Sequence, residues 1–489
     1  MAEHEIQKSK AIELLNKNLN KTLGEIDDKD IFLSLINVPH EKGIAGRIVE
    51  QCIFNYPADT EQKPDLIIID GNKKVPTELK TTGIVKKKDG YDAKEPISIT
   101  AVSIFEITSQ IYENSSFYHK INHLLFVYYE YIGKNVYAYD YRNFPLLSYQ
   151  FFEFSKEQKE TLKEDWTIVR TFVLEIEKRY EDNPDRKELI KKDYIAEKHT
   201  LRKKLTYLDL VPKYPSRFRI KKPLIRLIIA EHFGSKYETL PEYTSVKKID
   251  NKINNLLNQY KEKTISFIAL EVNIEIKKSK SIAEQIVCSM YGSKERKISK
   301  IKEFNEIGII AKTITVSMKN KRTEDTKLFR IDFTDFKDEK NFEDSQFFTY
   351  FNDYQFLYVI FKETNLKGSL ENNKLIGLKR VVFSEDFINT VVKTLWEDTK
   401  DKVLNNKLKD VTRKDKNGNI IKNKTGVISS APNFMKSTEN VVFIRGDSSD
   451  SSFKPELVNG IKMYNQYCWI RGDFLVNKIL NDNTNLVEI

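Results

Sequence analysis

Five short segments in the first half of this 489-residue chain recur, in the same order, in its second half. The pairs are IAGRIVEQ (44–51) with IAEQIVCS (282–289), ELKT (78–81) with IAKT (310–313), HLLFVYYE (123–130) with QFLYVIFK (355–362), EDWTIV around Trp166 with LWEDTK around Trp396, and FRIKKPLIRLII (218–229) with CWIRGDFLVNKI (468–479). A single match of apolar spacing is weak, because helices and strands of unrelated proteins share it. Five collinear matches indicate an internal duplication.

The duplication predicts two α/β domains, residues 1–238 and 239–489, and the length of the chain fits two such domains. In the first domain, apolar periodicity predicts helices over 5–20, 44–55 and 156–181, two short strands around a turn over 65–82, and further strands over 97–107 and 123–132. The second domain, as a complete copy, is expected to fold by itself.

Composition matters here for what it excludes. Hydrophobic residues make up 40% of the chain and charged residues 31%, which is typical of a folded protein rather than a disordered one. Cys52, Cys288 and Cys468 are too widely spaced for a zinc motif, so we expect reduced thiols. No run of 18 apolar residues and no secretory signal occur, which predicts a cytoplasmic protein without a membrane partner. The net charge of +10 permits nucleic acid as a partner.

The string KPDLIIIDGNKKVPTELKT predicts a β-hairpin that gathers charged side chains. Gly71-Asn72 is a two-residue hairpin signal. If these residues form the loop, partner numbers sum to 143 and Asp65 lies opposite Glu78. Lys80 points to the same face, because side chains on a strand alternate with period two.

Two carboxylates held across a hairpin repel each other unless a cation lies between them. Magnesium binds oxygen ligands, so Asp65 and Glu78 are candidate ligands for Mg²⁺, with Mn²⁺ as a substitute. Lys80 would then orient the attacking water and balance the charge that develops on phosphorus. The alternative is that this Glu-x-Lys triplet is structural, since such triplets are frequent in a chain rich in Lys and Glu.

The segments RIVEQ with Glu50, PD…ELK, and ENSSFYHK with Lys120 resemble the MutH-like endonucleases. This group includes the mismatch-repair nicking enzyme and the larger type II restriction enzymes that cut GATC, and the second resemblance covers nearly the whole chain. It implies two restriction-endonuclease-like domains that form a pseudo-dimer within a monomer. It also implies hydrolysis of double-stranded DNA that leaves 5′-phosphate ends, with a second domain that binds DNA but does not cut.

The resemblance assigns a role to each matched residue. Glu50 corresponds to an additional acidic residue of the metal site, Asp65 and Glu78 to metal ligands, Lys80 to the motif lysine and Lys120 to a second active-site lysine. In the second half the aligned positions are Cys288, Ile310 and Asn352, although Lys312 is kept. An apolar Ile310 offers no oxygen ligand, so we expect the second domain to be chemically inert.

A basic stretch with interleaved aromatic residues runs from 191 to 226. From it, and from the matching region of the second half, we select six candidate DNA-binding residues: Arg202, Arg219, Lys221, Lys222, Arg445 and Arg471. Arg445 and Arg471 are expected where the first half has Arg202 and Lys221. Alternatives remain open. One alternative is that the basic stretch is a solvated surface that does not bind DNA. Another is that the chain is a nicking or modification-dependent endonuclease, or a non-catalytic DNA-binding protein. The sequence also leaves open whether two chains meet on DNA or one chain acts by itself.

Overall fold

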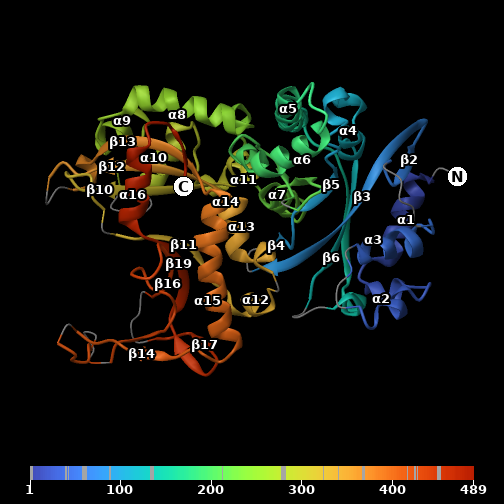
Figure 1. Cartoon of the computed structure of the whole chain (residues 1–489). Helices are drawn as coiled ribbons and strands as arrows, with labels where there is room; N and C mark the ends of the chain where they lie inside the picture. The colour runs from blue at the N-terminus through green and yellow to red at the C-terminus, as the bar shows by residue number, and fades with distance from the viewer. Residues whose placement is uncertain are drawn as a thin grey trace. The chain divides into compact units, whose positions relative to one another are not determined.

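The computed structural model describes residues 4–38, 41, 43–57, 63–87, 90–132, 137–211, 213–276, 282–322, 324–339, 341–365, 369–415, 417–422, 426, 428–448 and 453–489 (Figure 1). Its contacts divide the chain into unit 1, Met1–Ile249 with Lys300–Gly308, and unit 2, Asp250–Ser299 with Ile309–Ile489. Both units are mixed α/β. Residues 300–308 thus belong to unit 1, although they lie within the predicted second domain.

Unit 1 is built on a sheet with the strand order β1-β2-β3-β6-β7, and β4 pairs with the far end of β3. Its strands are β1 (Glu5–Gln7), β2 (Leu66–Asp70), β3 (Lys73–Lys87), β4 (Gly90–Ala93), β6 (Leu124–Glu130) and β7 (Leu146–Phe152). The apolar runs of β2 and β6 are largely buried in this sheet. Helices α1 (Lys8–Asn18), α2 (Leu23–Ile26) and α3 (Ile44–Ile48) lie together on one side of it (Figure 1).

A second sheet of unit 1 has the order β5-β9-β8, formed by β5 (Ile97–Ala101), β9 (Arg217–Ile220) and β8 (Leu208–Leu210). The other helices of this region are α4 (Ser116–Ile121), α5 (Lys156–Arg179), α6 (Arg186–Glu197), α7 (Lys222–His232), the start of α8 (Val246–Tyr260) and α11 (Lys302–Ile307). The long α5 begins at a capping box in which the side chains of Ser155 and Gln158 each accept a backbone N–H from the other residue.

Unit 2 has a four-stranded sheet with the order β10-β12-β13-β20 and a three-stranded sheet with the order β11-β19-β16. The strands are β10 (Ile309–Val316), β12 (Gln355–Lys362), β13 (Lys374–Val382), β20 (Leu486–Glu488), β11 (Thr326–Arg330), β19 (Asn465–Ile470) and β16 (Val442–Asp447). Two short ladders join β14 (Asp410–Thr412) to β15 (Ser430–Pro432) and β17 (Glu456–Val458) to β18 (Ile461–Met463).

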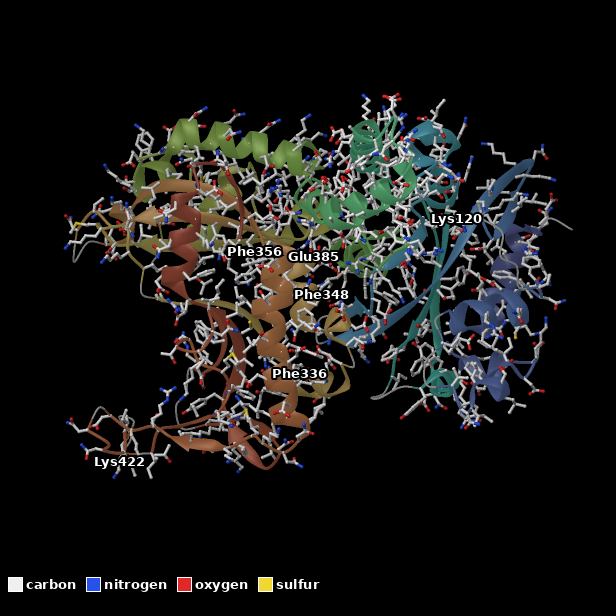
Figure 2. The ribbon with its side chains drawn as sticks, viewed as in Figure 1. Lys120, Phe336, Phe348, Phe356, Glu385 and Lys422 are labelled. Carbon is white, nitrogen blue, oxygen red and sulfur yellow. The ribbon has the colours of Figure 1, made fainter. Side chains whose placement is uncertain are left out.

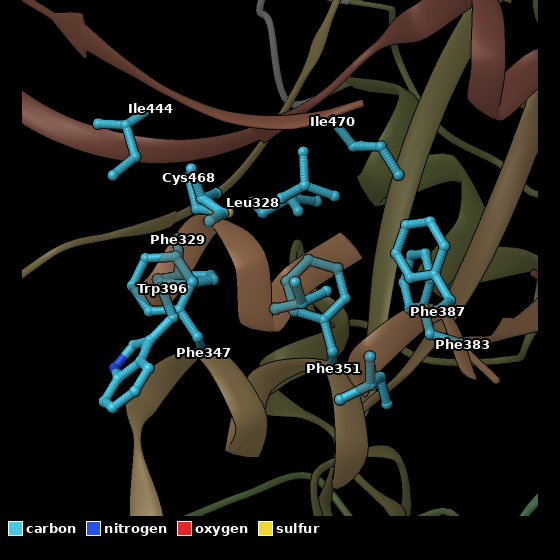
Figure 3. Packing of buried hydrophobic residues seen from close by; sticks show 14 of the residues in the cluster. Leu328, Phe329, Phe347, Phe351, Phe383, Phe387, Trp396, Ile444, Cys468 and Ile470 are labelled. Carbon is cyan, nitrogen blue, oxygen red and sulfur yellow. The ribbon is translucent and has the colours of Figure 1, made fainter. Parts of the chain in front are cut away.

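The helices of unit 2 are α9 (Ile265–Glu271), α10 (Ile282–Met290), α12 (Phe333–Asp338), α13 (Gln346–Asn352), α14 (Glu385–Phe387), α15 (Lys393–Leu404) and α16 (Gly472–Asn481). Its core lies between the two sheets and these helices. It contains many aromatic residues, among them Phe347, Phe351, Phe383, Phe387 and Trp396 (Figure 3). Such rings bury large apolar areas and prefer the edge-on and tilted contacts seen here.

The two units repeat the same strand pairings. In unit 1 the parallel ladder of β3 with β6 pairs Glu78 with Leu124, and in unit 2 the ladder of β10 with β12 pairs Ile310 with Phe356. Each residue of the second pair lies 232 positions after its counterpart in the first. The same offset separates ELKT from IAKT and HLLFVYYE from QFLYVIFK in the sequence. The smaller sheets also agree, since β5/β9 and β11/β19 each contain an irregularity after the second pair.

The structure differs from the predicted elements at several points. The strand predicted over 97–107 ends at Ala101, and the second strand of the hairpin continues to Lys87. Residues 5–7 form the strand β1, which pairs with β2, so the predicted helix over 5–20 begins only at Lys8. In the described part of unit 2, β10 pairs with β12 alone, and no strand takes the place that β2 has in unit 1. Among the described residues, no helix is long and apolar enough to cross a membrane.

Candidate active site

The hairpin of β2 and β3 has the register that the sequence predicts. The pairs run from Asp70 with Lys73 to Leu66 with Thr77, and each pair sums to 143. Asp65 directly precedes β2, and its Oδ2 accepts the backbone N–H of Leu79 at 2.8 Å. The carboxylate of Asp65 is therefore held against the segment of β3 that carries Glu78.

Glu78 is the centre of the site, with only 1% of its surface exposed. Its Oε1 accepts hydrogen bonds from Lys80 Nζ at 2.7 Å and from Lys120 Nζ at 3.1 Å. Lys80 comes from the same strand, whereas Lys120 comes from the last turn of α4 (Figure 2). One buried and one partly buried cation thus face one buried carboxylate.

The position of Lys120 depends on Ser115, a residue that the sequence interpretation did not single out. Ser115 caps α4 by accepting the N–H of Tyr118, and it is completely buried. This cap fixes where the helix begins and so which side Lys120 faces. The pair Ser115-Ser116 in ENSSFYHK is a signal for a helix cap, so the role of Ser115 was predictable from the sequence.

The second oxygen of Glu78, Oε2, is buried and accepts no hydrogen bond from any residue that the structure describes. Leaving a buried carboxylate oxygen without a partner is costly, and a bound cation removes that cost. Burial and the nearby Glu78 charge together raise the pKa of Asp65 above its usual value. The pair of carboxylates therefore fits a divalent cation, which prefers oxygen ligands.

Glu50 lies on a different element, the π-helical turn Val49–Ile53 that continues α3. Such turns recur at functional sites. A Cβ built on Gly46 would lie 3.9 Å from Glu50 Oε1 and 3.5 Å from Thr81 Oγ1, so this carboxylate lies near β3. Among the described residues, however, no three His, Cys, Asp or Glu side chains gather closely enough to hold a metal. The role of Glu50 as a third ligand stays a prediction.

The basic residues of unit 1 are less available to DNA than the sequence suggests. Lys221 is only 2% exposed and donates from Nζ to the carbonyl of Leu205 at 2.7 Å, so its selection as a phosphate contact is wrong. Arg219 is largely buried and paired with Asp209. Lys222 is half-buried against the carbonyl of Lys94. For Arg202 the contact with DNA stays a prediction.

The two arginines selected in unit 2 are both neutralised by carboxylates. Arg445 pairs with Asp325 at 2.8 Å and stacks on Trp469, and Arg471 pairs with Asp473 at 2.5 Å. Arg471 directly precedes α16 as Lys221 directly precedes α7, so that equivalence holds. Arg445 is not equivalent to Arg202. Val442 pairs with Ile470 in unit 2 as Leu208 pairs with Ile220 in unit 1, so Arg445 corresponds to residue 211.

In unit 2 the same positions form no carboxylate site. Lys312 matches Lys80 in the ladder, but its Nζ donates to the carbonyl of Lys327 at 2.9 Å. Burial lowers the pKa of Lys312 to about 8. The cap of α13, Ser345, matches Ser115 and places Tyr350, rather than Asn352, where unit 1 has Lys120. The hydroxyl of Tyr350 donates to the carbonyl of Leu328. The side chains of Lys312 and Tyr350 are therefore both hydrogen-bonded to the backbone of β11.

Comparison with known proteins agrees with this geometry. Residues 54–165 match the family model of the DNA mismatch repair enzyme MutH. This part of the chain is MutH-like. The match contains Asp65, Glu78, Lys80 and Lys120, whereas Glu50 precedes it.

A second similarity covers most of the chain. It is 23% identical over 486 residues to the type II restriction enzyme Sau3AI of Staphylococcus aureus, which covers 87% of this chain and 90% of that protein. The similarity therefore extends through both units and supports a restriction endonuclease of the MutH-like type.

Proposed function

We propose that this chain is a type II restriction endonuclease that hydrolyses double-stranded DNA at a short site with Mg²⁺, for which Mn²⁺ substitutes. The products would carry 5′-phosphate ends. The recognition sequence GATC is proposed from the family resemblance alone. The observation that carries the proposal is the buried Glu78, whose Oε1 is shared by two lysines while its Oε2 has no protein partner among the described residues.

Asp65 and Glu78 would hold the metal ion, with Glu50 as a further candidate ligand. When bound, the ion would supply a Lewis acid next to the scissile phosphate. Lys80 and Lys120 keep the Glu78 carboxylate in position. They also place positive charge near the five-coordinate phosphorus of the transition state, where negative charge accumulates. In the reaction the oxygen of water bonds to phosphorus, the bond from phosphorus to O3′ breaks, and O3′ takes up a proton.

Unit 2 is proposed as a DNA-binding copy that does not cut, so that one chain acts as a pseudo-dimer. Ile310 stands at the position of Glu78, and Cys288 at that of Glu50. The Nζ of the retained Lys312 donates to the backbone carbonyl of Lys327. These replacements remove the oxygen ligands and redirect the lysine, which supports the loss of chemistry in this unit.

The test is digestion of a plasmid of known sequence with Mg²⁺, followed by sequencing of the ends. The unchanged chain should produce discrete double-strand breaks at one short site, and Asp65→Asn should produce none. Asp70→Asn is the matched control, because Asp70 lies at the exposed end of the same hairpin. Single-strand breaks would instead indicate a nicking enzyme, and cutting of methylated DNA alone a modification-dependent one. No cleavage under any of these conditions would leave a non-catalytic DNA-binding protein.

A further inference from the structure

A projecting segment of unit 2 lies within residues 407–432, of which the structure describes all but 416, 423–425 and 427, and the described part of unit 1 has no counterpart of it. It follows α15 and precedes β16, where unit 1 instead has α6 between α5 and β8. We call it the basic arm. The β14/β15 ladder closes its base, and bridges join Lys414 to Ile420 and Lys422 to Ile428, so the chain folds back on itself. Lys422 lies near its outer end (Figure 2).

The basic arm holds an unusual share of the positive charge. Its sequence contains seven Lys and Arg residues against two Asp, a net charge of +5, which is half of the +10 of the whole chain. Nearby cations on the three-stranded sheet of unit 2 are matched by carboxylates, since Lys327 pairs with Asp447 and Arg330 with Glu456. The cations in the sequence of the arm, in contrast, far outnumber its two carboxylates.

Three described cations of the arm are exposed and not neutralised, whereas Lys407 at its base pairs with Asp401 at 2.9 Å. Arg413, Lys414 and Lys422 are exposed, and none of them forms an ion pair or a side-chain hydrogen bond within the described part of the chain. Like charges so close together repel each other and gain nothing from folding. A line of phosphates would satisfy all three.

The arm also exposes branched apolar side chains. Ile420 is 50% exposed, Ile428 49%, Val411 42% and Ile421 41%. A ladder of three pairs is marginal without a packed face, and this one has little core of its own. Exposed isoleucines between unpaired cations mark a surface that another molecule covers.

We propose that the basic arm is a second contact with duplex DNA, separate from the site of cutting. A β-ribbon fits a groove of duplex DNA, where its cations reach the phosphates on either side and its apolar side chains contact sugars and base edges. Arg413, Lys414 and Lys422 bind backbone phosphates, and Ile420 and Ile421 contact the groove. The inference rests on the proposed function in taking DNA as the partner.

The first test replaces the three cations in the full chain, Arg413→Gln with Lys414→Gln and Lys422→Gln. Binding to a 30-base-pair duplex is measured in Ca²⁺ at several salt concentrations. Each phosphate contact contributes about 0.9 to the slope of log affinity against log salt, so the slope should fall by about 2.7. Between about 50 and 200 mM salt, the unchanged chain should then lose about 40-fold more affinity than the variant.

The matched control removes three exposed lysines of unit 2 outside the arm, with Lys261→Gln, Lys319→Gln and Lys321→Gln. It has the same net charge as the arm variant and should keep the full slope. A second arm variant, Ile420→Ser with Ile421→Ser, should weaken binding while leaving the slope unchanged, because it removes no charge. Both arm variants should melt at the temperature of the unchanged chain, because these side chains are exposed.

Each outcome decides the matter. Equal slopes for the arm variant and the unchanged chain would overturn the assignment of the arm, even if the chain cuts DNA normally. An unchanged slope together with a lower sedimentation coefficient would identify the arm as a contact between copies, which also overturns it. If the unchanged chain binds duplex with the expected arm dependence but never cuts, the proposed function fails and the arm assignment stands.

Discussion

Lys80 and Lys120 donate to the same oxygen of Glu78, and this arrangement predicts the cost of removing Lys80. Lys80→Ala should lower the cleavage rate by about 100-fold, the loss typical of removing a positioned charge that stabilises a transition state. Single-turnover cleavage measures it. Lys73→Ala is the control, because Lys73 is an exposed lysine on the same strand. A loss below tenfold for Lys80→Ala would place this lysine outside the site.

Lys221 should affect stability rather than DNA binding. It is buried near Asp165, which accepts the N–H groups of Thr206, Tyr207 and Leu208, and whose pKa burial raises to about 6. Lys221→Met leaves that carboxylate without its nearby cation, which should cost about 3 kcal/mol of the free energy of unfolding. Urea unfolding measures the cost, with the exposed Lys204→Met as control. Equal stability combined with weaker DNA binding would return Lys221 to the DNA interface.

These residues show what a sequence reveals at this scale. The Gly71-Asn72 turn determines the register of the hairpin, and with it the proximity of Asp65 to Glu78, so that part of the site was predictable. The burial of Lys221 was not predictable, because a run of basic residues does not show which of them faces a buried carboxylate such as Asp165. That depends on how α5 packs near β8.

A buried carboxylate of α11, that of Glu306, is hydrogen-bonded to other elements of unit 1. Glu306 accepts hydrogen bonds from Gln158 of α5 and from Tyr207. Burial raises the pKa of Glu306 to about 7, with Glu303 adding to the shift and Lys302 opposing it. Because the folded pKa lies above the unfolded one, this contribution to stability is complete below about pH 4.5 and is lost as the pH rises through about 7.

Glu306→Gln should therefore remove a pH dependence. The variant should be more stable than the unchanged chain above pH 7, and the difference should shrink as the pH falls toward 5. Thermal melting across this range measures it. Glu242→Gln is the control, because Glu242 is exposed on the neighbouring segment. A constant difference at all pH values would mean that Glu306 does not titrate in this range.

The repeated elements were predictable, but their details were not. The offset of 232 gave the correct pairing of β10 with β12, because a buried parallel strand keeps its apolar pattern. The same offset placed Asn352 at the position of Lys120, which is wrong by two residues. The segment from the cap Ser345 to Phe356 is longer by two residues than the matching segment from Ser115 to Leu124, and only the caps show this.

The contacts within the chain revise the expectation that residues 239–489 fold by themselves. Residues 300–308 belong to unit 1, where Ile301, Phe304 and Ile307 are completely buried. A fragment of residues 239–489 loses that environment and exposes these side chains. We expect it to be aggregation-prone and to melt well below the full chain. Sedimentation and thermal melting test this, and a monomeric fragment with a sharp transition would contradict it.

The metal site at Glu78 is tested by the rate of duplex cleavage against Mg²⁺ concentration for the unchanged chain, Glu78→Gln and Asp70→Asn, with DNA binding measured in Ca²⁺. Glu78→Gln keeps the size of the side chain but removes the charge that holds a cation. We predict that Glu78→Gln binds DNA and does not cut at any Mg²⁺ concentration, while Asp70→Asn follows the unchanged chain. Cleavage by Glu78→Gln at the normal rate, or cleavage by the unchanged chain without a divalent cation, would contradict the account.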